Sequence, residues 1–260
     1  MTMQEQPSLD AETDRLVRNA TWIGVVPAVV LGLVLCLLNV FVGLAVAIVA
    51  SVAWVLLVRA RVAGAGARAL GSVASTPLTP GSQPRLENVL EGLCATGGVS
   101  DPSVHLVQSP AMNAMVVADR DRADLVLTTG LVDGLGRLEL EGIVANLLGR
   151  VRDGSARYGT TVLALFGTSS GAARRLAAGL GEQRSVHSDL AAVDMTRYPP
   201  GLISALARMS DAGTVVPAAA ASTAHLWIAP VVDGDDAVAP EVRDTALQPL
   251  SLRIAVLEEL

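Results

Sequence analysis

The sequence predicts an α+β protein in which an N-terminal transmembrane helical hairpin precedes a mainly helical domain with a small β-sheet. Three observations support this fold class: a long uncharged segment near the N-terminus, apolar residues at helical spacing through most of the later chain, and three short β-prone runs close together. We expect four parts: an N-terminal segment at 1–21, the hairpin at 22–58, a tether at 59–83 and the folded domain at 84–260.

The hairpin is predicted from residues 22–58, which contain no charged side chain. This length is about twice the roughly 20 residues that a helix needs to cross a bilayer once. Asn39 interrupts the run, so we predict a first helix at 22–38 and a second at 40–58. A cleaved signal peptide fits less well, because the preceding residues carry four acidic side chains and the apolar run is too long for a signal core.

Arginines flank both outer ends of the predicted hairpin, whereas its turn has none. Basic residues concentrate on the cytoplasmic side of membrane helices. We therefore expect a multi-pass protein of the cell's inner membrane with both termini, and hence residues 1–21, in the cytoplasm. Small residues recur at every fourth position of each span and predict close helix packing, either within the hairpin or against a partner. They are Gly24, Ala28, Gly32, Gly43, Ala47 and Ser51.

Composition excludes several classes of function. A mean hydropathy of +0.49 is high for a soluble globule and indicates that part of the chain lies in lipid. The net charge of -6 and the 3% aromatic content disfavour a nucleic acid partner, which needs basic and stacking surfaces. The two cysteines, Cys36 and Cys94, fit neither a disulfide framework nor a cysteine zinc site.

The folded domain begins after a tether whose clearest loop is 76–81. Apolar spacing predicts a helix at 84–95, and three β-prone runs at 104–107, 114–118 and 125–128 predict a small meander. Further helices are expected at 138–152, 157–180, 184–196, 200–209 and 249–260.

Four motifs follow one another along this domain: Pro84-Arg85-Leu86-Glu87-Asn88-Val89-Leu90-Glu91-Gly92-Leu93-Cys94, Met112-Asn113-Ala114, Thr128-Thr129-Gly130-Leu131 and Leu138-Glu139-Leu140-Glu141-Gly142-Ile143-Val144-Ala145. In this order and spacing they resemble the catalytic domain of HtpX-type membrane zinc metalloproteases. Segments 194–202 and 249–254 resemble later parts of that family. The resemblance implies a two-span hairpin followed by a cytosolic, zincin-like domain.

The chain departs from that family where zinc would bind. The family's His-Glu-x-x-His motif is replaced by Asn146-Leu147-Leu148-Gly149-Arg150. In a zincin the two histidines bind zinc and the glutamate polarises the attacking water. Here Asn146 is a poor ligand, Leu147 has no ionisable group, and Arg150 carries a positive charge. The third ligand of the family aligns with Ser185. We therefore expect no metal, no other cofactor and no catalytic residue at these positions.

Two structural expectations follow from the resemblance. Asp189 survives from the third-ligand motif, and Arg150 is expected to neutralise it in an ion pair shared with Asn146; the alternative is that Arg150 points to solvent. A retained peptide-binding edge strand is expected over five residues. They are Met112, Asn113, Ala114, Met115 and Val116.

Two classes of function remain open from the sequence. In the first, the chain is a pseudoprotease that serves as a binding, adaptor or regulatory subunit of a membrane assembly, with a membrane-protein partner or a second copy of itself. In the second, it is an active hydrolase, either a zinc protease with relocated ligands or a serine hydrolase. The serine would be Ser169, in a G-x-S-x-G match at 167–171. A turn between two helices is the favoured interpretation of that match, and His105 and His225 are expected to be structural.

Overall fold

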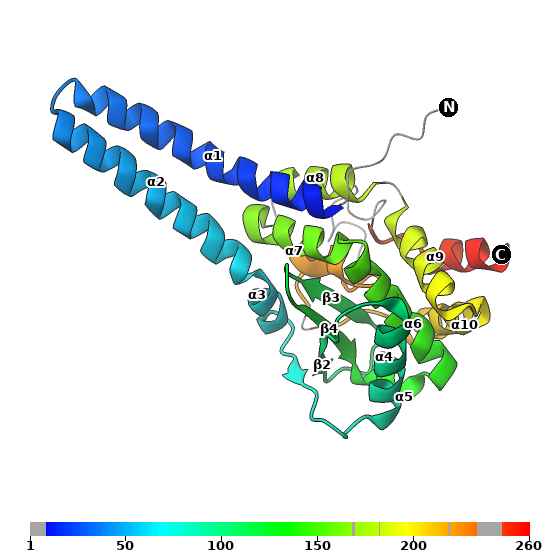
Figure 1. The fold of residues 1–260 in the computed structure, drawn as a ribbon. Helices are drawn as coiled ribbons and strands as arrows, with labels where there is room; N and C mark the ends of the chain where they lie inside the picture. The colour runs from blue at the N-terminus through cyan, green and yellow to red at the C-terminus, as the bar shows by residue number, and fades with distance from the viewer. Residues whose placement is uncertain (1–8, 168–169, 182, 218, 233–245) are drawn as a thin grey trace.

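The computed structural model describes residues 9–167, 170–181, 183–217, 219–232 and 246–260. It confirms an α+β fold with two N-terminal apolar helices and a small mixed sheet (Figure 1). Helices α1 (Leu9–Cys36) and α2 (Val40–Ala63) run antiparallel and project away from the domain. By length and composition, both are apolar enough to cross a membrane.

Helix α1 starts well before the predicted span. The segment predicted at 1–21 is helical from Leu9 onward and continuous with the first span. Two acidic residues in its first turn, Asp10 and Glu12, suit a helix N-terminus because they complement the positive end of the helix dipole. The predicted turn is confirmed at Asn39, whose side chain accepts hydrogen bonds from the backbone N–H groups of Phe41 and Val42 and so caps α2.

The small residues of the two spans face each other within the hairpin. A Cβ added to Gly32 would lie 2.4 Å from the Cβ of Ala47, and one added to Gly43 would lie 2.4 Å from the Sγ of Cys36. Contacts this short show that the two backbones approach closely only because side chains are missing here. At the domain end, the indole Nε1 of Trp54 donates to the carbonyl oxygen of Ala20 at 3.0 Å.

The sheet is mixed and not the predicted meander. Its strands are β1 (Thr76–Pro77), β2 (Ser103–Val107), β3 (Ala114–Ala118) and β4 (Ala123–Thr128), in the order β1-β2-β4-β3. β2 pairs with β4 in parallel, and β3 pairs with β4 antiparallel. The linker 108–113 carries the chain past β4 to the far edge. Hydrogen bonds from Gly130 N–H to Ser109 O and from Thr128 N–H to Asn113 O hold the linker there.

Helices form the rest of the domain. The predicted tether at 59–83 contains α3 and β1, and the predicted helix at 157–180 is broken at Gly167, whose φ of 57° suits glycine. The helices are α3 (Ala65–Gly71), α4 (Pro84–Gly97), α5 (Thr129–Gly134), α6 (Arg137–Arg152), α7 (Ser155–Phe166), α8 (Ser170–Leu180), α9 (Arg184–Thr196), α10 (Pro199–Ala212), α12 (Leu250–Glu258) and the 3-10 helix η1 (Ala221–Leu226).

Helix α6 is the centre of the domain. It packs against α4, α9 and α10 and also touches β3. Alternate residues of the sheet face opposite sides, so that Leu125 and Leu127 join the core around α6, whereas Met115 and Val126 join a second cluster with Trp227. The sheet is therefore buried on both faces, and α6 holds the family's zinc-motif positions inside the core.

Candidate functional site

Helices α6 and α9 bring together two of the residues singled out from the sequence. The side-chain nitrogen of Asn146, on α6, donates to Oδ1 of Asp189, on α9, at 2.8 Å. Each residue is only 1% exposed. The predicted contact between Asn146 and Asp189 is confirmed, and it joins the two helices that a zinc ion would join in a zincin.

The charge of Asp189 is neutralised by Arg253, on α12. Its Nε and Nη2 donate to the two carboxylate oxygens, each at 2.7 Å, and its Nη1 donates to the carbonyl oxygen of Ile228 at 2.6 Å. Both side chains of the pair are 1% exposed. A two-pronged contact of this kind is the geometry in which a buried carboxylate and a guanidinium satisfy each other best.

The predicted Arg150–Asp189 ion pair is wrong. Arg150 is buried, and it donates to the carbonyl oxygens of His225 at 2.8 Å and of Leu226 at 2.9 Å. Arg253 already satisfies both oxygens of Asp189, so Arg150 neutralises nothing and instead satisfies backbone acceptors. Burial, reinforced by the positive charge of Arg184, lowers the pKa of Arg150 to about 10, which leaves it protonated at neutral pH.

The two arginines hold one segment of chain, Ala224–Ala229, which we call the cover segment. It runs along the outer edge of β3: Trp227 forms an antiparallel bridge with Met115, and Ile228 N–H donates to Ala114 O at 2.8 Å. The expected peptide-binding edge is therefore occupied by the protein's own backbone. Its residues from Asn113 to Val116 are all fully buried.

Asn113 fastens the other end of the cover segment. Its side-chain nitrogen donates to the carbonyl oxygens of Thr214 at 2.9 Å and of Ala229 at 3.1 Å. The neighbouring Met112 donates its N–H to Gly213 O at 2.9 Å. The Met-Asn-Ala motif, which was expected to hold a substrate peptide, holds segments of this chain.

The remaining positions of the family's zinc site are filled or engaged elsewhere. Leu147 is fully buried in the core, and the hydroxyl of Ser185 donates to Ala246 O at 2.7 Å. A cavity of about 10 Å³ lies beside Asn146, Arg150 and Arg253. This is room for about one water molecule.

These residues do not fit a zinc ion. Zinc needs neutral imidazole, thiolate or carboxylate donors, whereas the site offers two guanidinium groups, an amide and one carboxylate that is already paired. Within the part of the chain that the structure describes, no three His, Cys, Asp or Glu side chains come together as a possible metal site. No catalytic step can be derived through zinc at this position.

His105 and His225, which were expected to be structural, each contact another residue of the folded domain. His105 Nε2 lies 3.3 Å from a carboxylate oxygen of Asp124. His225 is buried, and its Nε2 lies 3.1 Å from Gly159 O. Burial lowers the pKa of His225 to about 4, and the charge of Arg150 acts in the same direction. Ser169 lies outside the described residues, between α7 and α8.

Sequence reasoning missed Arg253 and the cover segment. Arg253 lies in the segment 249–254 that resembles a later part of the family, but a single arginine in a short helix carries no signal of burial. The sequence at 224–229 is typical of a loop, and an alanine-rich stretch precedes it. Its carbonyl groups come within hydrogen-bonding distance of Arg150 and Arg253 only in the folded chain.

The first prediction concerns the buried ion pair. We expect Arg253→Gln to lower the free energy of unfolding by about 3–5 kcal/mol, because Asp189 would remain buried and unpaired. The double variant Arg253→Met with Asp189→Asn should recover much of this loss. Arg197→Gln is the control, because Arg197 pairs with Asp194 on the surface, where both side chains are more than half exposed. This variant should lower the free energy of unfolding by at most about 1 kcal/mol. Equal losses in the two single variants, measured by denaturant unfolding in detergent, would contradict the assignment.

The second prediction concerns pH. The folded pKa of His225, about 4, lies below the ordinary 6.5, so the fold favours the neutral ring. The neutral ring therefore stabilises the fold fully above about pH 6.5, and this stabilisation is lost as the pH falls towards 4. At pH 5 the free energy of unfolding should be about 2 kcal/mol lower on this account. Unfolding measured from pH 7.5 to 5 should therefore depend less on pH in His225→Gln than in the wild type. His187→Gln, which removes an exposed histidine, should keep the wild-type slope, and identical slopes in all three proteins would refute the account.

Several known proteins are similar to this chain in amino-acid sequence. No family model matches it. A Protease HtpX homolog of Tropheryma whipplei is 29% identical over 56% of this chain and 62% of the relative. Homologs of the same name from Dictyoglomus thermophilum and Caldanaerobacter subterraneus are 29% and 24% identical, over 56% and 62% of this chain and 60% and 68% of those proteins.

The chain thus spans less than two thirds of the length of the first of these relatives. Their common name is that of the family that the motifs at 84–94, 112–114, 128–131 and 138–145 resemble, and the two apolar helices agree with a membrane protein. Over somewhat more than half of its length, the chain is therefore similar in sequence to HtpX-type proteases.

Proposed function

We propose that this chain is a catalytically inactive member of the family that acts as a binding, adaptor or regulatory subunit of a membrane assembly. The observation that carries the proposal is the buried Arg253–Asp189 ion pair beside Asn146, the residue that aligns with the first histidine of the zinc motif. An incoming metal ion would have to displace a guanidinium that makes two charge-assisted hydrogen bonds to reach this carboxylate.

The chemistry of the cluster supports the same proposal. Peptide hydrolysis by a zincin needs a Lewis acid and a general base. Leu147 stands at the position of the base and cannot take up a proton. Asp189 accepts three hydrogen bonds from the side chains of two residues, Asn146 and Arg253, and Arg150 is protonated at neutral pH. No group in this cluster is free to activate water.

The exposed apolar surface of the hairpin is the part of the chain that best suits binding to another protein. Large apolar side chains along both helices are exposed, including Leu33 and Val49. In a bilayer they would face lipid or the helices of a partner, which we take to be another membrane protein or a second copy of this chain. The arginine distribution favours an inner-membrane hairpin with both termini cytoplasmic.

The competing proposal is an active hydrolase, and the name of the relatives favours it. It would need zinc ligands away from α6, or Ser169 as a nucleophile. A serine nucleophile also needs an aspartate to orient its catalytic histidine, and Asp189, which follows Ser169 in the chain, is already bound by Arg253.

A paired assay separates the two proposals. We expect the purified full-length chain, supplied with zinc, to leave an unfolded membrane-protein substrate intact, while an HtpX-type relative with the complete motif cleaves it. We also expect no labelling by a fluorophosphonate probe. Zinc-dependent cleavage by the chain would favour relocated ligands, and labelling that disappears in Ser169→Ala would favour the serine hydrolase; either result contradicts the proposed inactivity.

A further inference from the structure

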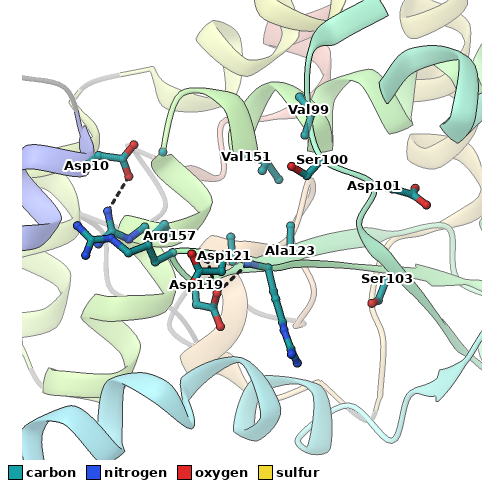
Figure 2. A pocket seen from close by; sticks show the side chains of 14 residues that line it. Asp10, Val99, Ser100, Asp101, Ser103, Asp119, Asp121, Ala123, Val151 and Arg157 are labelled. Carbon is teal, nitrogen blue, oxygen red and sulfur yellow. Dashed lines mark hydrogen bonds and ion pairs between the residues drawn. The ribbon is translucent and has the colours of Figure 1, made fainter. Parts of the chain in front are cut away.

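A pocket of about 310 Å³ lies where the hairpin joins the domain. The hairpin, the β3–β4 turn and α7 each contribute to its wall. Its lining comprises Val17, Arg59, Val62, Ala63, residues 118–122, Arg157, Thr160 and Thr161. It shares residues 118–122 and Arg157 with a neighbouring pocket of about 350 Å³, on one side of which Arg157 points towards Asp10 (Figure 2).

The position of the pocket along the hairpin places it at the level of lipid headgroups. The exposed apolar surface of α2 extends through Leu56 and Leu57, and the uncharged run ends at Val58. Arg59, the first charged residue after that run, lines the pocket. The pocket therefore begins where the hydrocarbon of a bilayer would end, on the same side as the domain, whichever way the hairpin is oriented.

The charges around the pocket favour an anion. Four arginines line it against two aspartates, whereas the neighbouring pocket has three arginines against four aspartates. One of the two aspartates, Asp119, is engaged in its own turn, where a carboxylate oxygen accepts the N–H groups of Asp121 and Arg122.

Among the residues that the structure describes, two of the four arginines have no competing partner. Arg157 donates to Asp10 and Asp14, and Arg120 donates to Asp14. The guanidinium groups of Arg59 and Arg122 make no hydrogen bond or ion pair with any residue that the structure describes. They reach the pocket from different elements, one from α2 and the other from the β3–β4 turn.

We propose that this pocket binds the phosphate of an anionic phospholipid headgroup between Arg59 and Arg122. Guanidinium groups suit phosphate because they donate several hydrogen bonds in one plane. The wall formed by Val17, Val62 and Ala63 would contact the glycerol and the first acyl carbons, which a soluble phosphate lacks. A bound lipid would link α2 to the β3–β4 turn and hold the domain at a fixed height against the membrane. This site does not depend on whether the chain is catalytically active.

The test uses the detergent-purified full-length chain titrated with dihexanoyl phosphatidylglycerol, dihexanoyl phosphatidylcholine, glycerol 3-phosphate or inorganic phosphate. The thermal unfolding midpoint and the number of lipids retained in native mass spectrometry are the readouts. We expect phosphatidylglycerol to raise the midpoint and to be retained, whereas phosphatidylcholine and the soluble anions should have little effect.

Variants of the arginines locate the site. Arg59→Gln and Arg122→Gln should each weaken the apparent affinity for phosphatidylglycerol about five- to tenfold. Arg61→Gln is the matched control, because it removes the same charge from the same end of α2 at an exposed residue that does not line the pocket. If phosphatidylcholine raised the unfolding midpoint as much as phosphatidylglycerol, or if all three variants weakened the apparent affinity equally, the proposed site would be wrong. An equal response to free phosphate would overturn the lipid as its ligand.

Discussion

The buried ion pair between Arg253 and Asp189 is the constraint on which the arrangement of the domain depends. It lies in the core, where each of the two side chains is only 1% exposed. Because a buried charge is tolerated only with its partner in place, α12 must dock on α9 whenever the domain folds. The same guanidinium binds the carbonyl oxygen of Ile228, and Asn146 shares the carboxylate. Together, Arg253, Asp189 and Asn146 link α6, α9, α12 and the cover segment.

Under the proposed function, this arrangement takes the place of a metal link between the helices. In a zincin, the ion joins the histidine-bearing helix to a later helix. Here hydrogen bonds from Asn146 and Arg253 to Asp189 make that connection, and Arg150 binds the cover segment against β3. The buried polar side chains of this cluster therefore serve the fold, and under the proposed function we expect interactions at the hairpin and at its junction with the domain.

Local signals in the sequence predicted the hairpin, the turn at Asn39 and the helix that carries residues 146–150, because uncharged length, a polar interruption and apolar spacing depend only on neighbouring residues. The order of the strands could not be predicted in this way, since the crossing at 108–113 depends on distant partners such as Gly130. The partner of Asp189 was misassigned for the same reason. Arg150 lies one helical turn from Asn146 on α6 and was therefore the nearer candidate in the sequence. Arg253 reaches the carboxylate of Asp189 only after α12 has packed against the domain.

Elemental analysis for zinc on the detergent-purified, tag-free chain tests the central claim most directly. It should be run beside a variant in which His105, His187 and His225 are all replaced. If arginine and aspartate stand where a metal would link the helices, zinc should be well below one atom per chain in both proteins. Near-stoichiometric zinc in the wild type that is lost in the variant would contradict this account and indicate a metal site built elsewhere.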